Sequence, residues 1–437
     1  MVSIGGTALP GVKTTVESAN NAAVNVGAPA QVGLVGQGDL TTGTATAGEV
    51  YEIRTPSQAR SEFGTGTLLA EAAVDALTEG AYPVYCAPAG ETSVSAEDIG
   101  TSATGTLANA PVTEDVEDMS VTVDSSSKTP VVTYKDPTTQ TPGTDEFLYN
   151  PVTGAYALST APSTSATVDY VHYDYQVAVD AIINEEGERI DFLGSVNEND
   201  NVVSMIHDAA LQQIQFYNFM IAVAGFAPYI ADTSTITAEY DSSRIQQLYP
   251  TRNADGESII GSYLGLRGRI GIDNSPIFKR LKTQNDLIQT LSKGSQTDLV
   301  NEQIVPVADE ARGSRIVEDL TCVADDNAGE SSMRQALHRL IVDYVTEIVN
   351  EASERFIGEL HTQSARNALR SIIVSELQQL RNTNAITAFT VTVEKVDAMT
   401  ASVDCGIDTI DPLRNILATI TAGQIENPDQ QVSSAAA

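Results

Sequence analysis

The chain has 437 residues, with 24 Lys plus Arg against 58 Asp plus Glu, which gives a formal net charge of −34. A surface this acidic repels phosphate, so nucleic acid is excluded as a partner and anionic membrane surfaces are disfavoured. Only seven of the 24 cations are Lys, a composition that we interpret as adaptation to concentrated salt, where screening weakens repulsion between like charges. The alternative is an acidic protein of an ordinary cytosol. The hydrophobic fraction of 42% is typical of globular chains, and the length suggests roughly two to four domains.

Cysteine usage fits a reducing compartment. Cys86, Cys322 and Cys405 lie far apart without zinc or redox spacing, so we expect isolated thiols. The N-terminus lacks the basic and apolar segments of a secretory signal, and no run of 18 apolar residues predicts a transmembrane helix. Neither secretion nor membrane insertion is expected.

An α/β pattern begins at residue 31. Residues 31–36 read as a short buried strand, and a short helix is expected over 57–63. The apolar residues of 67–79 form one helical stripe, and Gly80 stands where a C-terminal cap belongs. Residues 82–86 then alternate as a strand. This strand–helix–strand order predicts an α/β core.

Composition changes near residue 91. From there to residue 175 Thr, Ser, Val, Asp and Pro dominate, and no helical stripe is present. Turn signals recur, as at Pro142-Gly143 and Asn150-Pro151. We predict a small all-β domain inserted into the α/β core.

Helix and strand patterns return after the insertion. A helix is expected over 202–219 and a buried strand over 220–225. Residues 332–381 have the clearest apolar periodicity and predict two long amphipathic helices or one bent helix, with Ser332 and Gln335 as a capping box. Three strand candidates follow, over 389–393, 401–407 and 415–421.

The predicted fold is therefore a mixed α/β, multi-domain core with an inserted all-β domain and extended terminal arms. We expect an N-terminal arm over 1–30, a first part of the core over 31–90, the inserted β-rich domain over 91–175, a continuation of the core over 176–325, a C-terminal domain over 326–422 and a flexible tail over 423–437.

No catalytic constellation, metal set or cofactor motif stands out. Gly33, Gly36 and Gly38 follow a strand, but they lack the Gly-Lys-Ser/Thr of a phosphate loop, and a tight turn is the favoured interpretation. The acidic segment 325–330 does not match a calcium loop, and a loop leading into a helix is the better interpretation. A Ser-His-Asp triad stays open, although no Gly-x-Ser-x-Gly elbow exists. The scattered histidines are His172, His207, His338 and His361.

One cationic cluster interrupts the acidic chain. It contains five of the 24 cations within 16 residues, and they are Arg267, Arg269, Lys279, Arg280 and Lys282. Either these side chains form local ion pairs, or they make a docking face for another acidic protein.

The order of features resembles the contractile-tail sheath proteins. It begins with Pro10-Gly11-Val12 followed by Glu17, and continues with the glycine-rich strand over 32–38. A Phe63-Gly64 step, an alanine-rich helix and an outgoing strand over 82–87 come next, and the segment 311–321 is similar to the family's Arg-x-Trp-Gly-x-x-Thr-Leu region without its tryptophan. The resemblance covers the chain outside residues 91–175. It includes the helices and strands of the C-terminal domain.

The resemblance implies a structural subunit without enzymatic activity or cofactors. Such subunits form hexameric rings stacked helically around a tail tube, between baseplate and tail terminator proteins, and they contract to drive the tube through the host envelope. Terminal arms add strands to a neighbour's C-terminal sheet. The arm residues expected here are Val12, Thr14 and Val16 at one end, and Ile416, Ala418 and Ile420 at the other.

The resemblance implies assembly in the host cytoplasm and a final location in the virion tail. The acidic bias suggests a virus of a salt-loving archaeon as the source. Two other classes of protein stay open. A halophilic surface adhesin would suit the Thr-rich insert, and an α/β hydrolase would need a site that the sequence does not reveal.

Overall fold

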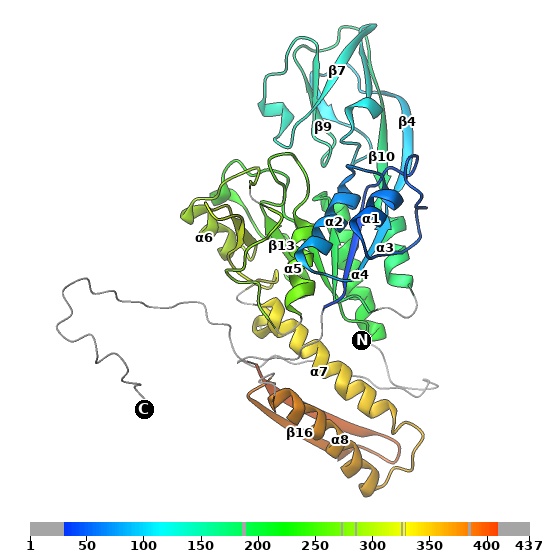
Figure 1. The fold of residues 1–437 in the computed structure, drawn as a ribbon, viewed down its shortest axis with the longest axis vertical. Helices are drawn as coiled ribbons and strands as arrows, with labels where there is room; N and C mark the ends of the chain where they lie inside the picture. Colours follow the sequence, from blue (N-terminus) through cyan, green and yellow to red (C-terminus); the bar gives the residue numbers. More distant parts are fainter. Residues whose placement is uncertain are drawn as a thin grey trace, which may run out of the picture.

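The computed structural model describes residues 30–409, except for 186–188, 272–273, 285, 325–326, 328 and 383–385. Three parts follow one another along its long axis (Figure 1): a seven-stranded sheet, a central α/β layer, and a pair of helices on a β-hairpin. The predicted linking-arm residues Val12, Thr14, Val16, Ile416, Ala418 and Ile420 lie outside the described residues.

The central part is an eight-stranded sheet with the order β15-β14-β13-β12-β11-β1-β3-β2. Six neighbouring strands are parallel, and the edge strands β2 and β15 are antiparallel to their neighbours. Most of the parallel strands are buried along their whole length because helices cover both faces, which explains their continuous apolar sequences. The strands are β1 (Val32–Gly36), β2 (Tyr51–Ile53), β3 (Val84–Pro88), β11 (Phe192–Ser195), β12 (Ile221–Gly225), β13 (Ile245–Tyr249), β14 (Val305–Ala308) and β15 (Arg315–Ile316).

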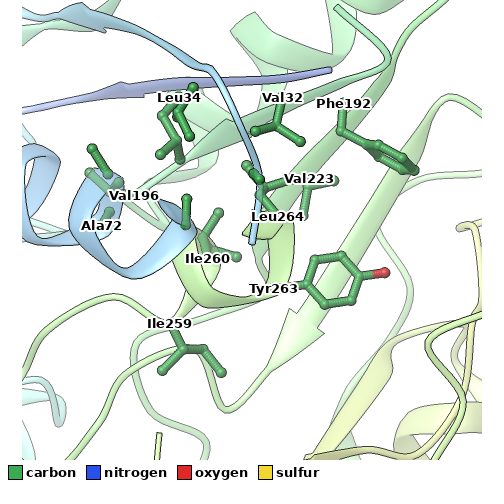
Figure 2. Packing of buried hydrophobic residues seen from close by; sticks show 14 of the residues in the cluster. Val32, Leu34, Ala72, Phe192, Val196, Val223, Ile259, Ile260, Tyr263 and Leu264 are labelled. Atoms are coloured by element: carbon green, nitrogen blue, oxygen red, sulfur yellow. The ribbon is translucent and has the colours of Figure 1, made fainter. Parts of the chain in front are cut away.

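Two helical layers sandwich this sheet. On one face α1 (Pro56–Phe63), α2 (Leu68–Glu79) and α5 (Ile260–Ile270) contribute to a core cluster with Val32 and Leu34. On the other face α3 (Tyr175–Asn184) and α4 (Asp200–Gln213) pack around Val35 and Leu193. Helix α6 (Lys293–Asn301) lies beside β14. Figure 2 shows the first cluster, with Ile260, Tyr263 and Leu264 of α5 meeting Ala72 of α2 and strand residues such as Val32 and Val223.

The glycines after residue 32 serve close packing, so the expectation of a tight turn is wrong for Gly33 and Gly36. Both lie within β1. A Cβ atom on Gly36 would lie 2.5 Å from Val196 Cγ2, and one on Gly38 would lie 3.0 Å from the carbonyl oxygen of Phe63. Glycine is required at Gly36 because the loop after β11 approaches the strand closely.

The segment that the sequence assigns to an inserted β domain forms a separate seven-stranded sheet, in the order β4-β10-β6-β7-β8-β9-β5. It has its own apolar cluster, which includes Phe147, Tyr149 and Tyr170. The chain enters from β3 and returns directly into α3, and Gly90 pairs with Asp174 at the two ends. The strands are β4 (Gly90–Asp98), β5 (Thr104–Thr106), β6 (Ser120–Val123), β7 (Ser126–Val132), β8 (Glu146–Tyr149), β9 (Ala155–Leu158) and β10 (Ala166–Asp174).

The last part contains α7 (Ala336–Glu354) and α8 (Gln363–Asn382), so the periodic segment is two helices and not one bent helix. They pack with the hairpin of β16 (Ala388–Lys395) and β17 (Ala401–Asp408) around a shared apolar cluster. The predicted capping box is wrong. Helix α7 begins after Gln335, whose side chain makes no capping hydrogen bond, and Ser332 lies in a short 3-10 turn before it.

Smaller differences concern element ends and cysteines. Tyr82 is 62% exposed and precedes β3, which begins at Val84. Helix α4 ends at Gln213 and continues as a 3-10 turn to Phe216, short of the predicted residue 219. The expectation of isolated thiols is confirmed, since Cys86, Cys322 and Cys405 are all free.

Candidate assembly surfaces

A buried ion pair joins α7 to the central sheet. Arg244, the residue before β13, binds both carboxylate oxygens of Asp343 on α7, at 2.5 and 2.7 Å. Arg339 donates to the same carboxylate from one helical turn away. The side chains of Arg244 and Asp343 are only 4% and 3% exposed. Breaking such a pair leaves a buried charge unpaired, so the joint resists separation.

A second ionic contact lies beside the first. Arg189 donates to Asp191 Oδ1 at 2.7 Å and also binds Glu347 on α7. Burial raises the pKa of the Glu347 carboxyl to about 7, against the opposing effect of the Arg189 guanidinium. Helix α7 is therefore held to the central part at two neighbouring points.

The seven-stranded sheet is joined to the centre through Arg252. This fully buried guanidinium binds Glu198 at 2.9 Å and Glu114 of the seven-stranded part at 2.8 Å. The Tyr134 ring stacks on it with 4.4 Å from Arg252 Cζ to the ring centre. Burial raises the pKa of the Glu114 carboxyl, while Arg252 lowers it. One arginine thus holds together side chains from both parts.

The predicted cationic docking face does not form as one surface. Arg267 is fully buried, where it binds Asp319 and donates to the Tyr263 hydroxyl at 3.0 Å. A residue inside the core cannot contact another subunit, so Arg267 must be removed from the predicted face. Its position follows from α5 itself, which is buried on nearly all sides.

The other four cations are closer to the surface and have partners within the chain. Lys282 Nζ donates to the Glu79 backbone oxygen at 2.9 Å, and Arg269 lies 3.5 Å from the Glu79 carboxylate. Arg280 pairs with Glu310 at 2.9 Å, and Lys279 donates to a backbone oxygen. A docking role for Arg269, Lys279, Arg280 and Lys282 stays a prediction.

In the β16–β17 hairpin both strands are edge strands. Within residues 30–409 as described, these two strands pair only with each other, over eight residue pairs. One face of the hairpin packs on α8, and the other exposes Glu394, Asp404 and Asp408. Unpaired edges of this kind accept additional strands.

A groove of about 440 Å³ runs along α8, and the residues that line it, which include Arg370, Ser371, Val374 and Gln378, belong to this helix. The Nε atom of Arg370 donates to the backbone oxygen of Val391 in β16, at 2.9 Å. The groove and the strand edge therefore meet at Arg370.

A larger cleft of about 700 Å³ separates the seven-stranded sheet from α3 and α4. Its lining is polar and includes Asn109, His172, Asp174, Asn199 and Asp208. Nowhere in the described part of the chain do three or more His, Cys, Asp or Glu side chains gather in a way that could hold a metal ion. The helices of this same part include none that is long and apolar enough to span a bilayer.

No protein-family model matches the chain, and no curated protein matches it in sequence. Solved structures do match. The helical sheath of the anti-feeding prophage in its contracted state has a TM-score of 0.57 at 15% identity, over 96% of this chain and 100% of that one. The contracted sheath of the extracellular contractile injection system PVC gives 0.56 at 13% identity, over 96% and 99%. A sheath tail protein of Listeria innocua gives 0.54 at 14% identity, over 89% and 94%.

Each of these neighbours is a sheath or a sheath tail protein. The chain has the fold of the contractile sheath proteins of phage tails and injection systems, over nearly its full length.

Proposed function

We propose that the chain is the subunit of a contractile tail sheath. In this role six copies form a ring, rings stack helically around an inner tube, and contraction drives the tube through a host envelope for genome delivery. The observation that carries the proposal is the full-length match to sheath folds, including sheaths in the contracted state. The acidic composition favours a virus of a salt-loving archaeon as its source.

The proposed contraction needs subunits that move as rigid bodies. The buried arginines Arg244 and Arg252 supply this property, because each ties one outer part of the molecule to the central sheet. Rearrangement between subunits then costs less than rearrangement within one.

The proposed links between subunits are strands added to the β16–β17 hairpin. Each backbone hydrogen bond contributes roughly 1 kcal/mol net, so a strand making about five of them survives the exchange of side-chain contacts during contraction. The segments that supply the added strands are the N-terminal arm around Val12, Thr14 and Val16, and the C-terminal segment around Ile416, Ala418 and Ile420. Tube, baseplate and terminator proteins are the further partners.

Deletion of residues 1–20 tests this function. The truncated protein should keep its circular dichroism spectrum and thermal unfolding, because the described fold begins at residue 30. It should no longer form tubes in negative-stain images taken at high salt. Deletion of the tail 423–437 is the control and should leave tubes intact. Unchanged polymerisation after removal of residues 1–20 would contradict the arm model.

A further inference from the structure

The outer edge of β16 has a defined pattern of backbone groups. At the hairpin turn, Val396 N–H donates to the Thr400 oxygen at 3.0 Å. Hydrogen-bonded and non-bonded pairs alternate along an antiparallel ladder, and Val391 stands opposite Cys405, an odd number of pairs away. The N–H and C=O of Val391 therefore point away from β17, toward the open edge.

This edge carries one side-chain contact in its middle. Arg370 reaches from α8 to the outward carbonyl of Val391, with a donor–acceptor distance of 2.9 Å. A strand that paired with β16 would need the same carbonyl oxygen for its own N–H. Arg370 must release Val391 before a full ladder can form.

The side of β16 that lies under α8 is apolar. In β16 the residues Phe389, Val391 and Val393 face the apolar cluster under α8. An added strand would point every second side chain to the same side. There it would meet the apolar cluster that the hairpin shares with α8.

We propose that Arg370 caps the open edge of β16 in the free subunit, and that the N-terminal arm of a neighbouring copy, Val12–Val16, displaces it on assembly. This inference rests on the proposed sheath function. Exposed strand edges tend to pair with strands of unrelated chains, and the cap blocks this pairing. The arm's own strand can displace it because a full ladder replaces one side-chain hydrogen bond.

Charge selects the N-terminal arm as the occupant. If Val12, Thr14 and Val16 face the α8 side of the hairpin, Lys13 lies on the opposite face, where the hairpin exposes Glu394, Asp404 and Asp408. The C-terminal candidate over 415–421 contains no cation to place there.

A labelled peptide of residues 8–20 tests the cap. Its binding to the full-length protein, kept below its assembly concentration, is measured by fluorescence anisotropy. The Arg370→Ala variant should bind the peptide about tenfold more tightly, equivalent to about 1.4 kcal/mol. Arg366→Ala is the matched control and should bind like the unaltered protein, since Arg366 lies one turn earlier on α8 and contacts Gln363 of its own helix.

Equal or weaker binding by Arg370→Ala would overturn the proposal, as would tighter binding of a peptide covering 412–424. Circular dichroism checks folding, and Arg370→Gln provides a second variant of similar length that should also bind more tightly. Assembly followed by light scattering separates the two levels of inference. If the protein forms tubes but Arg370→Ala binds the peptide no more tightly, the cap alone is refuted. If Arg370→Ala binds the peptide tenfold more tightly but no tubes form at any salt concentration, the sheath function is refuted and the edge cap is retained.

Discussion

Several arginines of this acidic chain are buried and therefore do not offset the negative charge at its surface. Arg244, Arg252, Arg267 and Arg339 are all buried, and each has at least one carboxylate partner. Buried pairs of this kind contribute less to net stability than their number suggests, but removing one partner is costly. They fix the positions of elements, and the solvent-exposed surface is left with few cations.

The Arg267–Asp319 pair allows a sharp test of this view. Asp319→Ala leaves Arg267 charged and buried without its partner, and should lower the free energy of unfolding by about 3–5 kcal/mol in urea titrations. The double variant Arg267→Met with Asp319→Leu should recover most of this loss. Arg54→Ala, which removes an exposed pair with Glu52, should have no measurable effect. Equal losses of unfolding free energy for Asp319→Ala, the double variant and Arg54→Ala would contradict the view that an unpaired buried charge causes the loss.

Glu347 predicts a pH dependence of stability. Its folded pKa of about 7 lies above the ordinary value of 4.5, so the unfolded chain binds fewer protons between these values. The contribution of Glu347 to the free energy of unfolding is therefore present below about pH 4.5 and lost as the pH rises through about 7. Glu347→Gln should reduce the fall in unfolding free energy between pH 5 and 8.

The control for this prediction is Glu351→Gln, one turn further along α7, where the side chain is 72% exposed. It should follow the pH profile of the unaltered protein. Should Glu347→Gln and Glu351→Gln change the profile equally, the burial of Glu347 is not the cause.

At the scale of elements, the sequence predicts what local periodicity determines. The apolar stripes of α2, α7 and α8 and the alternation in β16 are visible because each element places its own residues on one face. The order of the eight-stranded sheet is not visible, since it depends on pairings between distant segments.

The cationic cluster shows the same limit at the candidate site. Arg267 and Arg280 belong to one 16-residue segment, but their partners Asp319 and Glu310 follow 52 and 30 residues later. No local signal distinguishes the buried arginine from the half-buried one. The contact of Arg370 with Val391 is likewise hidden in the sequence, because it requires α8 to lie over β16.

The seven-stranded sheet should be removable as a unit. Its ends meet where Gly90 pairs with Asp174, so an Asn-Gly turn can replace residues 91–173 without stretching the core. Arg252 keeps Glu198 as a partner after the loss of Glu114. We expect a folded, cooperatively unfolding protein that still forms tubes, as judged by circular dichroism and negative-stain images. A variant that folds but no longer assembles would place inter-subunit contacts on this sheet.

At the scale of the whole molecule, the three parts arranged along the long axis are tied by buried arginines into one elongated body (Figure 1). Such a body suits an assembly in which subunits shift relative to one another without unfolding. The net charge of −34 on each copy then opposes stacking.

Assembly should therefore depend on salt. The Debye length is about 3 Å at 1 M salt and about 10 Å at 0.1 M, so dilution restores repulsion between neighbouring subunits. Tubes followed by analytical sedimentation should be stable in molar salt and loosen on dilution. Tubes that stay intact in dilute buffer would indicate that the acidic side chains avoid the interfaces.

The central proposal is that this chain is a sheath subunit that assembles into tubes. Electron microscopy of the purified full-length protein in molar salt tests it most directly. We predict hollow tubes whose helical averages show six subunits in each ring. Monodisperse single subunits across the whole concentration and salt range would contradict the claim.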